Sequence, residues 1–371
     1  MQEQMRIAII YLGRRGSGGR ISFEIARQLN EKSQLLAVVS QHAESRRLWE
    51  SVPCERLEVD TYQNLPGAVT SWIARSKIRQ LAGHIRGFKP DVLLFPMFYT
   101  WNPFLQRYLR DIPTVVAVHD PVPHPGLVDF FYRQMEDRSI RMAERCIYFS
   151  QSLKQALQQR KGSAEKLDHI PLGALVFRKQ DDTRVSQTPP RESVLLFFGR
   201  ITRYKGLEDL LRAYRKIIEN HRVRLVIAGE GDLRPYRELI KGLPDVDVVN
   251  RWINEDEAGT YFEQASMVVL PYTSASQSGV LTVAAGFGLP VIATRTGGLS
   301  EQIQDTVTGL LVEPGSVDQL VAAIEKLLDD PEWARQLGYS LRRDYAENRS
   351  WETISNRVHA SLERAVNEYG K

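Results

Sequence analysis

Short, unbroken apolar runs recur along the 371 residues, and stretches with apolar positions at helical spacing separate them. Unbroken runs, in contrast to alternating ones, are typical of strands buried on both faces of a parallel sheet. Helices are predicted over 19–29, 68–86 and 128–143, and the chain is purely helical in pattern after residue 313. The predicted strands are 6–12, 35–39, 91–96, 114–119, 146–150, 194–199, 224–229, 246–250, 267–271, 290–294 and 309–312.

This alternation is interrupted once, by the polar stretch 170–193 with its Pro189–Pro190 pair. The apolar runs on each side of this stretch are numerous enough to form a doubly wound sheet of their own. We therefore predict an α/β protein with two Rossmann-like domains, over 1–174 and 175–350. In such sheets ligands bind at the carboxyl ends of the strands, so candidate site residues are sought directly after each run.

Composition narrows the class of protein. A hydrophobic fraction of 43% with 25% charged residues supports two cores and excludes a disordered or coiled-coil chain. Two cysteines, Cys54 and Cys146, exclude a disulfide scaffold and favour a reducing compartment. The opening run is interpreted as a first strand and not as a signal peptide, and no apolar stretch of about 18 residues predicts a transmembrane helix.

Charge is unevenly distributed. Residues 1–180 hold 26 Lys and Arg against 17 Asp and Glu, whereas the remaining residues hold 23 against 28. The first half therefore faces nucleic acid, a phosphate-bearing substrate or an anionic membrane, or is a solvated basic face without a partner. Segment 68–89 is basic and amphipathic, which fits either a membrane-surface helix or a helix packed into the core.

Glycine-rich and basic turns follow several of the predicted strands. Gly16, Gly18 and Gly19 lie between a strand and a helix, where backbone N–H groups and the helix dipole favour an anion. Their spacing is not G-x-G-x-x-G, which disfavours a dinucleotide site, and a simple tight turn is the alternative. Arg200 and Lys205 follow the first strand of the second domain and suit a diphosphate, unless this loop is a solvated surface.

Segment 274–303 carries two further turns of this kind. Ser276 to Gly279 precede an apolar helix and offer hydroxyls and free N–H groups at its start. Gly297 and Gly298 follow the next strand and precede Glu301. In the first domain, His119 and Asp120 end a strand, where they suit acid–base work or hydrogen bonds to sugar hydroxyls, or a purely structural role for His119.

Taken together, these segments resemble the family 4 retaining glycosyltransferases, also called glycosyl transferases group 1, over essentially the whole chain. The resemblance rests on GRITRYKGL (199–207), AGEGDLRP (228–235), GFGLPVIATRTGGLSEQI (286–303) and TGLLVEPGS (308–316). It implies the GT-B fold, with two Rossmann-like domains facing across a cleft and segment 351–371 returning to the first domain. The first domain would bind the acceptor and the second the nucleotide sugar.

The resemblance also implies roles for individual residues. Arg200 and Lys205 would hold the donor diphosphate, and His119 would lie beside the donor sugar; these three form the expected catalytic set. The expected donor contacts are Gly18, Gly19, Gly199, Gly229, Glu230, Trp252, Ile253, Gln277, Ser278, Gly279, Val280 and Glu301.

One departure from the family pattern concerns two glutamates eight positions apart, one near the sugar and one on the ribose. Ala275 and Val283 stand at these positions, so the ribose lacks its carboxylate unless Glu301 or a neighbour replaces it.

The resemblance implies retaining transfer of a hexose from a nucleotide sugar to a glycan or lipid-linked acceptor in cell-envelope polysaccharide synthesis. UDP-glucose or another UDP-hexose is the favoured donor, ahead of GDP-mannose. No cofactor and no metal are expected, and no nucleic-acid partner, because RRM, KH and helix-turn-helix signatures are absent. The expected location is the cytoplasm, with peripheral contact at an anionic membrane. A sugar-nucleotide 2-epimerase and a non-catalytic nucleotide-sugar-binding subunit are the alternatives.

Overall fold

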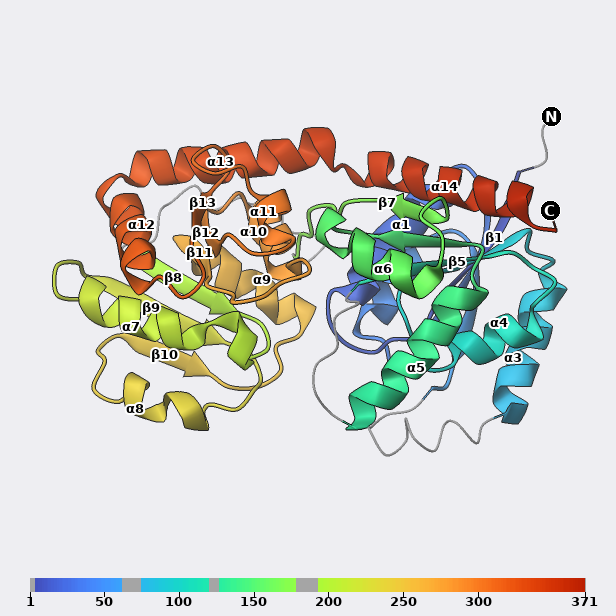
Figure 1. Ribbon diagram of the computed structural model, residues 1–371, viewed down its shortest axis with the longest axis horizontal. Helices are drawn as coiled ribbons and strands as arrows, with labels where there is room; N and C mark the ends of the chain where they lie inside the picture. Colours follow the sequence, from blue (N-terminus) through green and yellow to red (C-terminus); the bar gives the residue numbers. More distant parts are fainter. Residues whose placement is uncertain (1–3, 62–74, 120–126, 178–192, 371) are drawn as a thin grey trace. The chain divides into compact units, whose positions relative to one another are not determined.

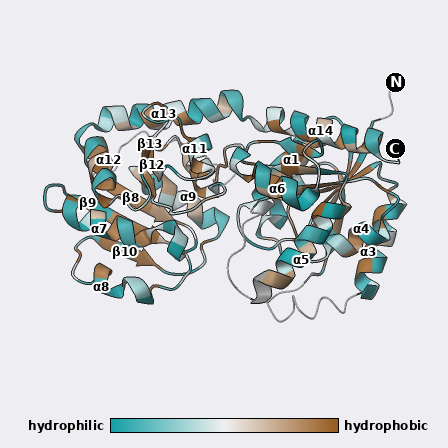
Figure 2. Ribbon diagram, viewed as in Figure 1, coloured by the Kyte–Doolittle hydropathy of each residue, from teal (hydrophilic) through white to brown (hydrophobic). Residues whose placement is uncertain are grey.

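The computed structural model describes residues 4–61, 75–119, 127–177 and 193–370. The chain divides into an N-terminal unit, residues 1–172 with 351–371, and a C-terminal unit, residues 173–350. Each unit has one parallel sheet with helices on its two faces (Figure 1). Apolar residues follow the strands and the sides of the helices that face them (Figure 2). The predicted fold class, two doubly wound Rossmann-like sheets, is confirmed.

In the described part of the N-terminal unit, seven parallel strands form one sheet in the order β3-β2-β1-β4-β5-β6-β7. The strands are β1 (Arg6–Tyr11), β2 (Gln34–Ser40), β3 (Glu55–Val59), β4 (Val92–Phe95), β5 (Thr114–Val118), β6 (Arg145–Tyr148) and β7 (Leu167–His169). The helices are α1 (Gly18–Leu29), α3 (Arg75–Gly87), α4 (Asn102–Tyr108), α5 (Leu127–Met142), α6 (Lys154–Lys161), α14 (Trp351–Glu368) and the 3-10 turns η1 (Glu44–Ser51) and η3 (Gln151–Leu153).

Helix α3 places its apolar side in the core of this unit. Ile78, Leu81 and Ile85 are all buried against the face of the sheet that also carries α4, α5 and α6. Of the two interpretations of the basic amphipathic segment 68–89, a helix packed into the core is therefore correct for its described part. The apolar side of this helix is not available to a membrane. Trp72 and Ile73 lie outside the described residues. Among the described residues no helix is both long and apolar enough to cross a bilayer.

The opposite face of the same sheet is covered by α1 and the terminal helix α14, which contacts β4, β5 and β6. Asp168 of β7 fixes α14 through a buried cluster of charges. It accepts from Arg145 at 2.8 Å and, from α14, from Ser361 and Arg364 at 2.6 Å each. Burial raises the pKa of Asp168, but the hydrogen bonds from Arg145 and Ser361 outweigh it and hold the pKa below its ordinary value.

Over residues 193–350 of the C-terminal unit, six parallel strands form one sheet in the order β10-β9-β8-β11-β12-β13. The strands are β8 (Ser193–Phe198), β9 (Val223–Ala228), β10 (Val246–Val249), β11 (Met267–Leu270), β12 (Val291–Thr294) and β13 (Leu310–Val312). The helices are α7 (Leu207–Ile217), α8 (Arg237–Ile240), α9 (Glu255–Gln264), α10 (Gly279–Phe287), α11 (Leu299–Gln302), α12 (Val317–Asp329), α13 (Pro331–Asn348) and the 3-10 turns η4 (Arg203–Lys205) and η5 (Arg234–Tyr236).

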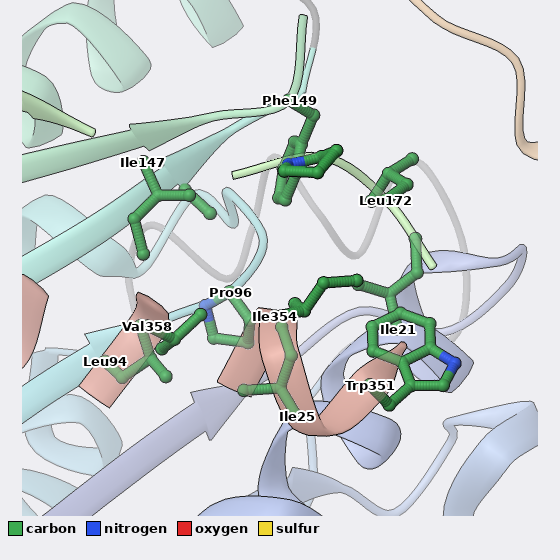
Figure 3. Close-up of a pocket in the computed structure, with 12 residues that line it drawn as sticks. Ile21, Ile25, Leu94, Pro96, Ile147, Phe149, Leu172, Trp351, Ile354 and Val358 are labelled. Atoms are coloured by element: carbon green, nitrogen blue, oxygen red, sulfur yellow. The ribbon is translucent and has the colours of Figure 1, made fainter. Parts of the chain in front are cut away.

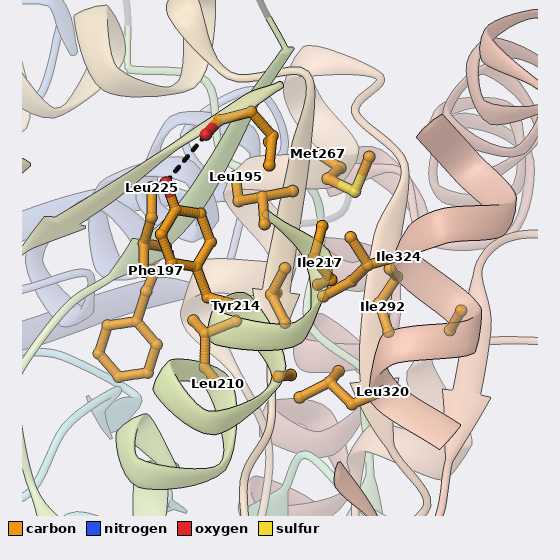
Figure 4. Close-up of a cluster of buried hydrophobic side chains, with 14 of the residues drawn as sticks. Leu195, Phe197, Leu210, Tyr214, Ile217, Leu225, Met267, Ile292, Leu320 and Ile324 are labelled. Carbon is orange, nitrogen blue, oxygen red and sulfur yellow. Dashed lines mark hydrogen bonds between the residues drawn. The ribbon is translucent and has the colours of Figure 1, made fainter. Parts of the chain in front are cut away.

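The core of this unit lies between the sheet and the helices α7, α12 and α13 (Figure 4). Tyr214 of α7 is fully buried, and its hydroxyl donates to the carbonyl of Val223 at 2.9 Å, so the polar end of this ring is satisfied inside the core. On the other face, the ring of Phe262 in α9 packs on Phe198 with centroids 5.0 Å apart. The sheet is thus covered by helices on both faces.

All eleven predicted strands are present. The prediction missed β3 and β7, which are the two edge strands of the first sheet. Both are partly exposed and carry charged residues, so neither forms an unbroken apolar run.

Candidate functional site

The point where strand order reverses in the second sheet lies between β8 and β11, which are hydrogen-bonded neighbours. The loop after β8 and the turn after β11 therefore meet at one edge. They are packed together closely: a Cβ on Gly206, whose φ is +68°, would lie 1.8 Å from the carbonyl oxygen of Pro271. The amide of Thr273 also donates to the carbonyl of Tyr204 at 2.7 Å.

Lys205 brings a buried cation to this edge. Only 8% of the residue is exposed, and its Nζ donates to the hydroxyl of Tyr272 at 3.1 Å. A Cβ on Gly199, whose φ is +98°, would lie 2.9 Å from Lys205 Nζ and 3.4 Å from Cγ2 of Val280. Glycine at position 199 therefore leaves the room that lets the ammonium lie beside the start of α10.

The start of α10 adds hydrogen-bond donors to the same place. Ser278 caps the helix, because its Oγ accepts from the amide of Leu281 at 3.3 Å, and that Oγ lies 3.5 Å from the hydroxyl of Tyr272. The N–H groups of Gly279 and Val280 belong to the first turn and have no acceptor within the helix. A buried ammonium next to amide N–H groups at a helix N-terminus is an arrangement suited to phosphate. We call Lys205, Tyr272 and residues 278–280 the phosphate cluster.

The other residues expected in the C-terminal unit follow strands at the same edge but lie outside this cluster. Arg200 and Glu230 are exposed, Gly229 and Ile253 are buried, and Trp252, Gln277 and Glu301 keep part or most of their surface in solvent. Their expected roles toward a ligand stay predictions. Within the described part of the chain, no group of three or more His, Cys, Asp and Glu side chains is placed to hold a metal ion.

Neither position of the missing glutamates offers a carboxylate or an open side chain. Ala275 contributes its backbone, since its carbonyl accepts from Gly298 at 3.0 Å, and Gly297 lies directly against the same carbonyl. Val283 is buried inside the unit. The turn after β12 is therefore fixed on the turn after β11 through main-chain contacts.

His119 follows β5 in the N-terminal unit. Its Nε2 lies 3.1 Å from the carbonyl of Pro96, and its ring centroid is 4.3 Å from that of Phe149. A carbonyl can only accept, so Nε2 carries the proton of the neutral ring. Burial lowers the pKa of His119 to about 4, more than the hydrogen bond to Pro96 raises it. The imidazole is therefore neutral at physiological pH. Asp120 and His124 lie outside the described residues.

An apolar pocket lies next to His119, at the carboxyl edge of the first sheet and under α1 and α14 (Figure 3). Pro96 and Phe149, which both contact His119, form part of its wall. Gly18 and Gly19 begin α1 nearby in the chain, with Gly18 against Met97 and Gly19 against Ser45. This edge of the N-terminal unit combines one neutral imidazole with apolar surroundings.

Three residues at this site in the C-terminal unit were not predicted from the sequence. Tyr272 directly follows a predicted strand, so the search after each run could have found it. Gln302 and Tyr345 hydrogen-bond each other, and only the tertiary fold brings them next to the phosphate cluster. Nothing in their local sequence distinguishes them.

Comparisons with known proteins cover both units. The model described as "Glycosyl transferases group 1" matches residues 192–330, and the "Glycosyl transferase 4-like domain" model matches residues 18–173. An uncharacterized glycosyltransferase of Methanocaldococcus jannaschii is 34% identical over 44% of this chain and 43% of its own length. The alpha-D-kanosaminyltransferase of Streptomyces kanamyceticus is 25% identical over 66% of this chain and 67% of its own length. The MMP alpha-(1->4)-mannosyltransferase of Mycolicibacterium hassiacum is 26% identical over 71% and 68%. The chain thus spans less than half to about two thirds of these relatives.

Two solved structures share the fold. The Anabaena protein Alr3699/HepE in complex with UDP-glucose superposes with a TM-score of 0.73 at 17% identity, over 97% of this chain and 100% of that one. Sucrose-phosphate synthase from Thermosynechococcus elongatus gives 0.71 at 19% identity, over 98% and 100%. At these identities the likeness shows the fold alone.

Proposed function

This chain belongs to the glycosyl transferases group 1, a family with the GT-B fold, and from that membership we propose that it is a retaining hexosyltransferase using a nucleotide sugar. The favoured donor is UDP-glucose or another UDP-hexose. The proposed acceptor is a glycan or a lipid-linked saccharide of the cell envelope.

The observation that carries the proposal is the phosphate cluster. Breaking the bond between the sugar and a nucleoside diphosphate leaves negative charge on the departing β-phosphate. The Lys205 ammonium and the N–H groups of Gly279 and Val280 are held in place before that charge develops. Groups fixed in this way stabilise the transition state more than the ground state. A fixed cation also does what a divalent metal does in other transferases, so we propose a metal-independent reaction.

The names of the comparison proteins support the donor class and the stereochemistry. The solved structure of Alr3699/HepE holds UDP-glucose. Two relatives carry alpha in their names, one as an alpha-D-kanosaminyltransferase and one as an alpha-(1->4)-mannosyltransferase. An alpha linkage made from an alpha-linked nucleotide sugar is a retained configuration. Because Ala275 and Val283 offer no carboxylate, Glu301 is the proposed hydrogen-bond partner of the ribose.

The neutral imidazole of His119 sets a limit on its role. With a pKa of about 4 the ring carries a single proton at neutral pH, and Nε2 donates that proton to the carbonyl of Pro96. We assign it to hydrogen bonding with a sugar hydroxyl and not to general acid catalysis. Arg200, exposed at the same edge as the phosphate cluster, is the second cation proposed for the diphosphate.

The proposed setting is the cytoplasmic side of a membrane, with peripheral contact through the basic N-terminal half. The acceptor is proposed to bind in the N-terminal unit.

The test is incubation with UDP-glucose, UDP-galactose, UDP-GlcNAc and GDP-mannose, with and without a lipid-diphosphate saccharide. Release of the nucleoside diphosphate, with an acceptor product whose anomeric proton coupling shows retention, supports the proposal. Free sugar epimerised at C2 without acceptor would identify the 2-epimerase. Tight binding of a nucleoside diphosphate with no turnover of any donor would identify a binding subunit.

A further inference from the structure

We propose that Gln302 is a positioning residue that aims the N–H of Gly279 at the donor β-phosphate. The inference rests on the proposed function, because it assigns the direction of a donor group in the phosphate cluster. Gln302 ends α11 and is 7% exposed.

The amide of Gln302 pairs with both backbone groups of one residue. The N–H of Ser278 donates to Oε1 of Gln302 at 2.9 Å, and Nε2 of Gln302 donates back to the carbonyl of Ser278 at 3.3 Å. The second hydrogen of Nε2 is directed to the hydroxyl of Tyr345, 3.2 Å away. All of these groups are buried, so each pairing is made where water does not compete.

The planar peptide bond explains why this pairing affects the ligand. The carbonyl of Ser278 and the N–H of Gly279 belong to one peptide unit, and in a trans peptide they point in opposite directions. Fixing the carbonyl toward Gln302 therefore fixes the N–H of Gly279 away from Gln302. The same residue, Ser278, meets Tyr272 through its Oγ, and Tyr272 holds Lys205. The carbonyl of Ser278 also accepts from the amide of Thr282 in α10 at 3.4 Å. Gln302 therefore adds a second hydrogen bond that orients this phosphate donor, and it supports Ser278, whose Oγ meets Tyr272.

Tyr345 anchors Gln302 to a different part of the unit. It lies in α13, is buried, and carries the guanidinium of Arg349 at 4.6 Å from its ring centroid. Arg349 in turn donates to the carbonyl of Glu301 at 2.9 Å, next to Gln302 in the chain. Tyr345 of α13 and Arg349, which directly follows α13, thus hold the last two residues of α11, so the orientation of Gln302 does not depend on the short α11 segment alone.

The experiment compares Gln302→Met with the control Gln304→Met by titration calorimetry with UDP and with UMP. Methionine keeps the length of the side chain but makes none of the three hydrogen bonds, whereas Gln304 is exposed two residues away. We expect UDP binding to weaken about tenfold in Gln302→Met, the size of one hydrogen bond to a charged group, and UMP binding by less than about threefold, because UMP lacks the β-phosphate. Gln304→Met should bind both as the parent protein does.

A second variant, Tyr345→Phe, removes only the hydroxyl that anchors Gln302 and is expected to weaken UDP binding by a few fold with UMP unchanged; it also serves if Gln302→Met does not fold. The inference would be overturned if folded Gln302→Met binds UDP as tightly as the parent protein and differs only in a lower melting temperature. If only Tyr345→Phe folds, the same result in that variant would overturn it. Either result would leave the proposed function intact. If the parent protein binds neither UDP nor GDP, ADP or TDP, the proposed function fails, and the inference fails with it.

Discussion

Replacing Lys205 by methionine separates the two effects of a buried cation. Methionine has a similar length and fills the same space, but it lacks the charge and the hydrogen bond to Tyr272. A hydrogen bond between a charged amine and phosphate contributes about 1.5–3 kcal/mol, so we expect nucleoside diphosphate binding to weaken, and turnover to fall, by about 10- to 150-fold. Without ligand, the melting temperature should stay equal or rise, because the charge of a residue that is only 8% exposed no longer has to be desolvated.

The measurement is a calorimetric titration with the nucleoside diphosphate together with a thermal melt in its presence and absence. Lys216→Ala is the matched control, since Lys216 lies on the following helix α7 and is exposed in a pair with Asp318. It should change neither reading. Near-normal affinity and kinetics in Lys205→Met would refute the assignment of the phosphate cluster, and a strongly lowered melting temperature without ligand would show that Lys205 has a structural role instead.

Three further predictions concern metal, histidine and the terminal helix. EDTA should leave the transfer rate unchanged, whereas loss of activity restored by manganese would contradict the metal-independent reaction. Between about pH 6.5 and 4 the unfolded chain binds a proton that native His119 does not, so the free energy of unfolding decreases by up to ~3 kcal/mol as the pH is lowered through this window. Urea unfolding of His119→Gln should show a smaller decrease, and an identical pH dependence would contradict a neutral ring at His119. Asp168→Asn should lower the free energy of unfolding by about 3 kcal/mol in urea titrations, because Arg145 is left buried with a weaker partner. The stabilisation by Asp168 is present above the unfolded pKa near 3.8 and is lost as the pH falls through the lower pKa of the folded state, so equal stability of the variant and the parent at pH 7 would contradict this role of Asp168.

The interior of both sheets could be predicted from the sequence because it is buried on two faces. Strands such as Val92–Phe95 and Met267–Leu270 are apolar at every position, so the run itself marks the strand. The edge strands β3 and β7 are covered on fewer sides, carry charged residues and depend on pairing with a neighbour that local sequence does not reveal. The rule that finds central parallel strands therefore misses the edges.

The candidate site, like the sheets, could be predicted from the sequence only in part. Lys205 and Ser278 follow strands in the chain, so a search at strand ends finds them. That their side chains meet through Tyr272 depends on β8 and β11 being neighbours, which the sequence indicates only through the fold class. Gln302 is five residues after Gly297 in a segment of ordinary composition, and its contact with Ser278 joins positions 24 residues apart. Contacts of this kind are decided by tertiary packing.

The most direct test of the account is a thermal-shift screen of the protein against UDP, GDP, ADP and TDP, each beside its nucleoside. A ligand that binds only the folded state at a hundred times its Kd adds about 2.7 kcal/mol to stability, which is easily visible as a shift in melting temperature. We predict that one nucleoside diphosphate stabilises the protein clearly, that its nucleoside alone does not, and that Lys205→Met removes most of the shift. A melt unmoved by all four diphosphates would contradict a diphosphate site at the start of α10.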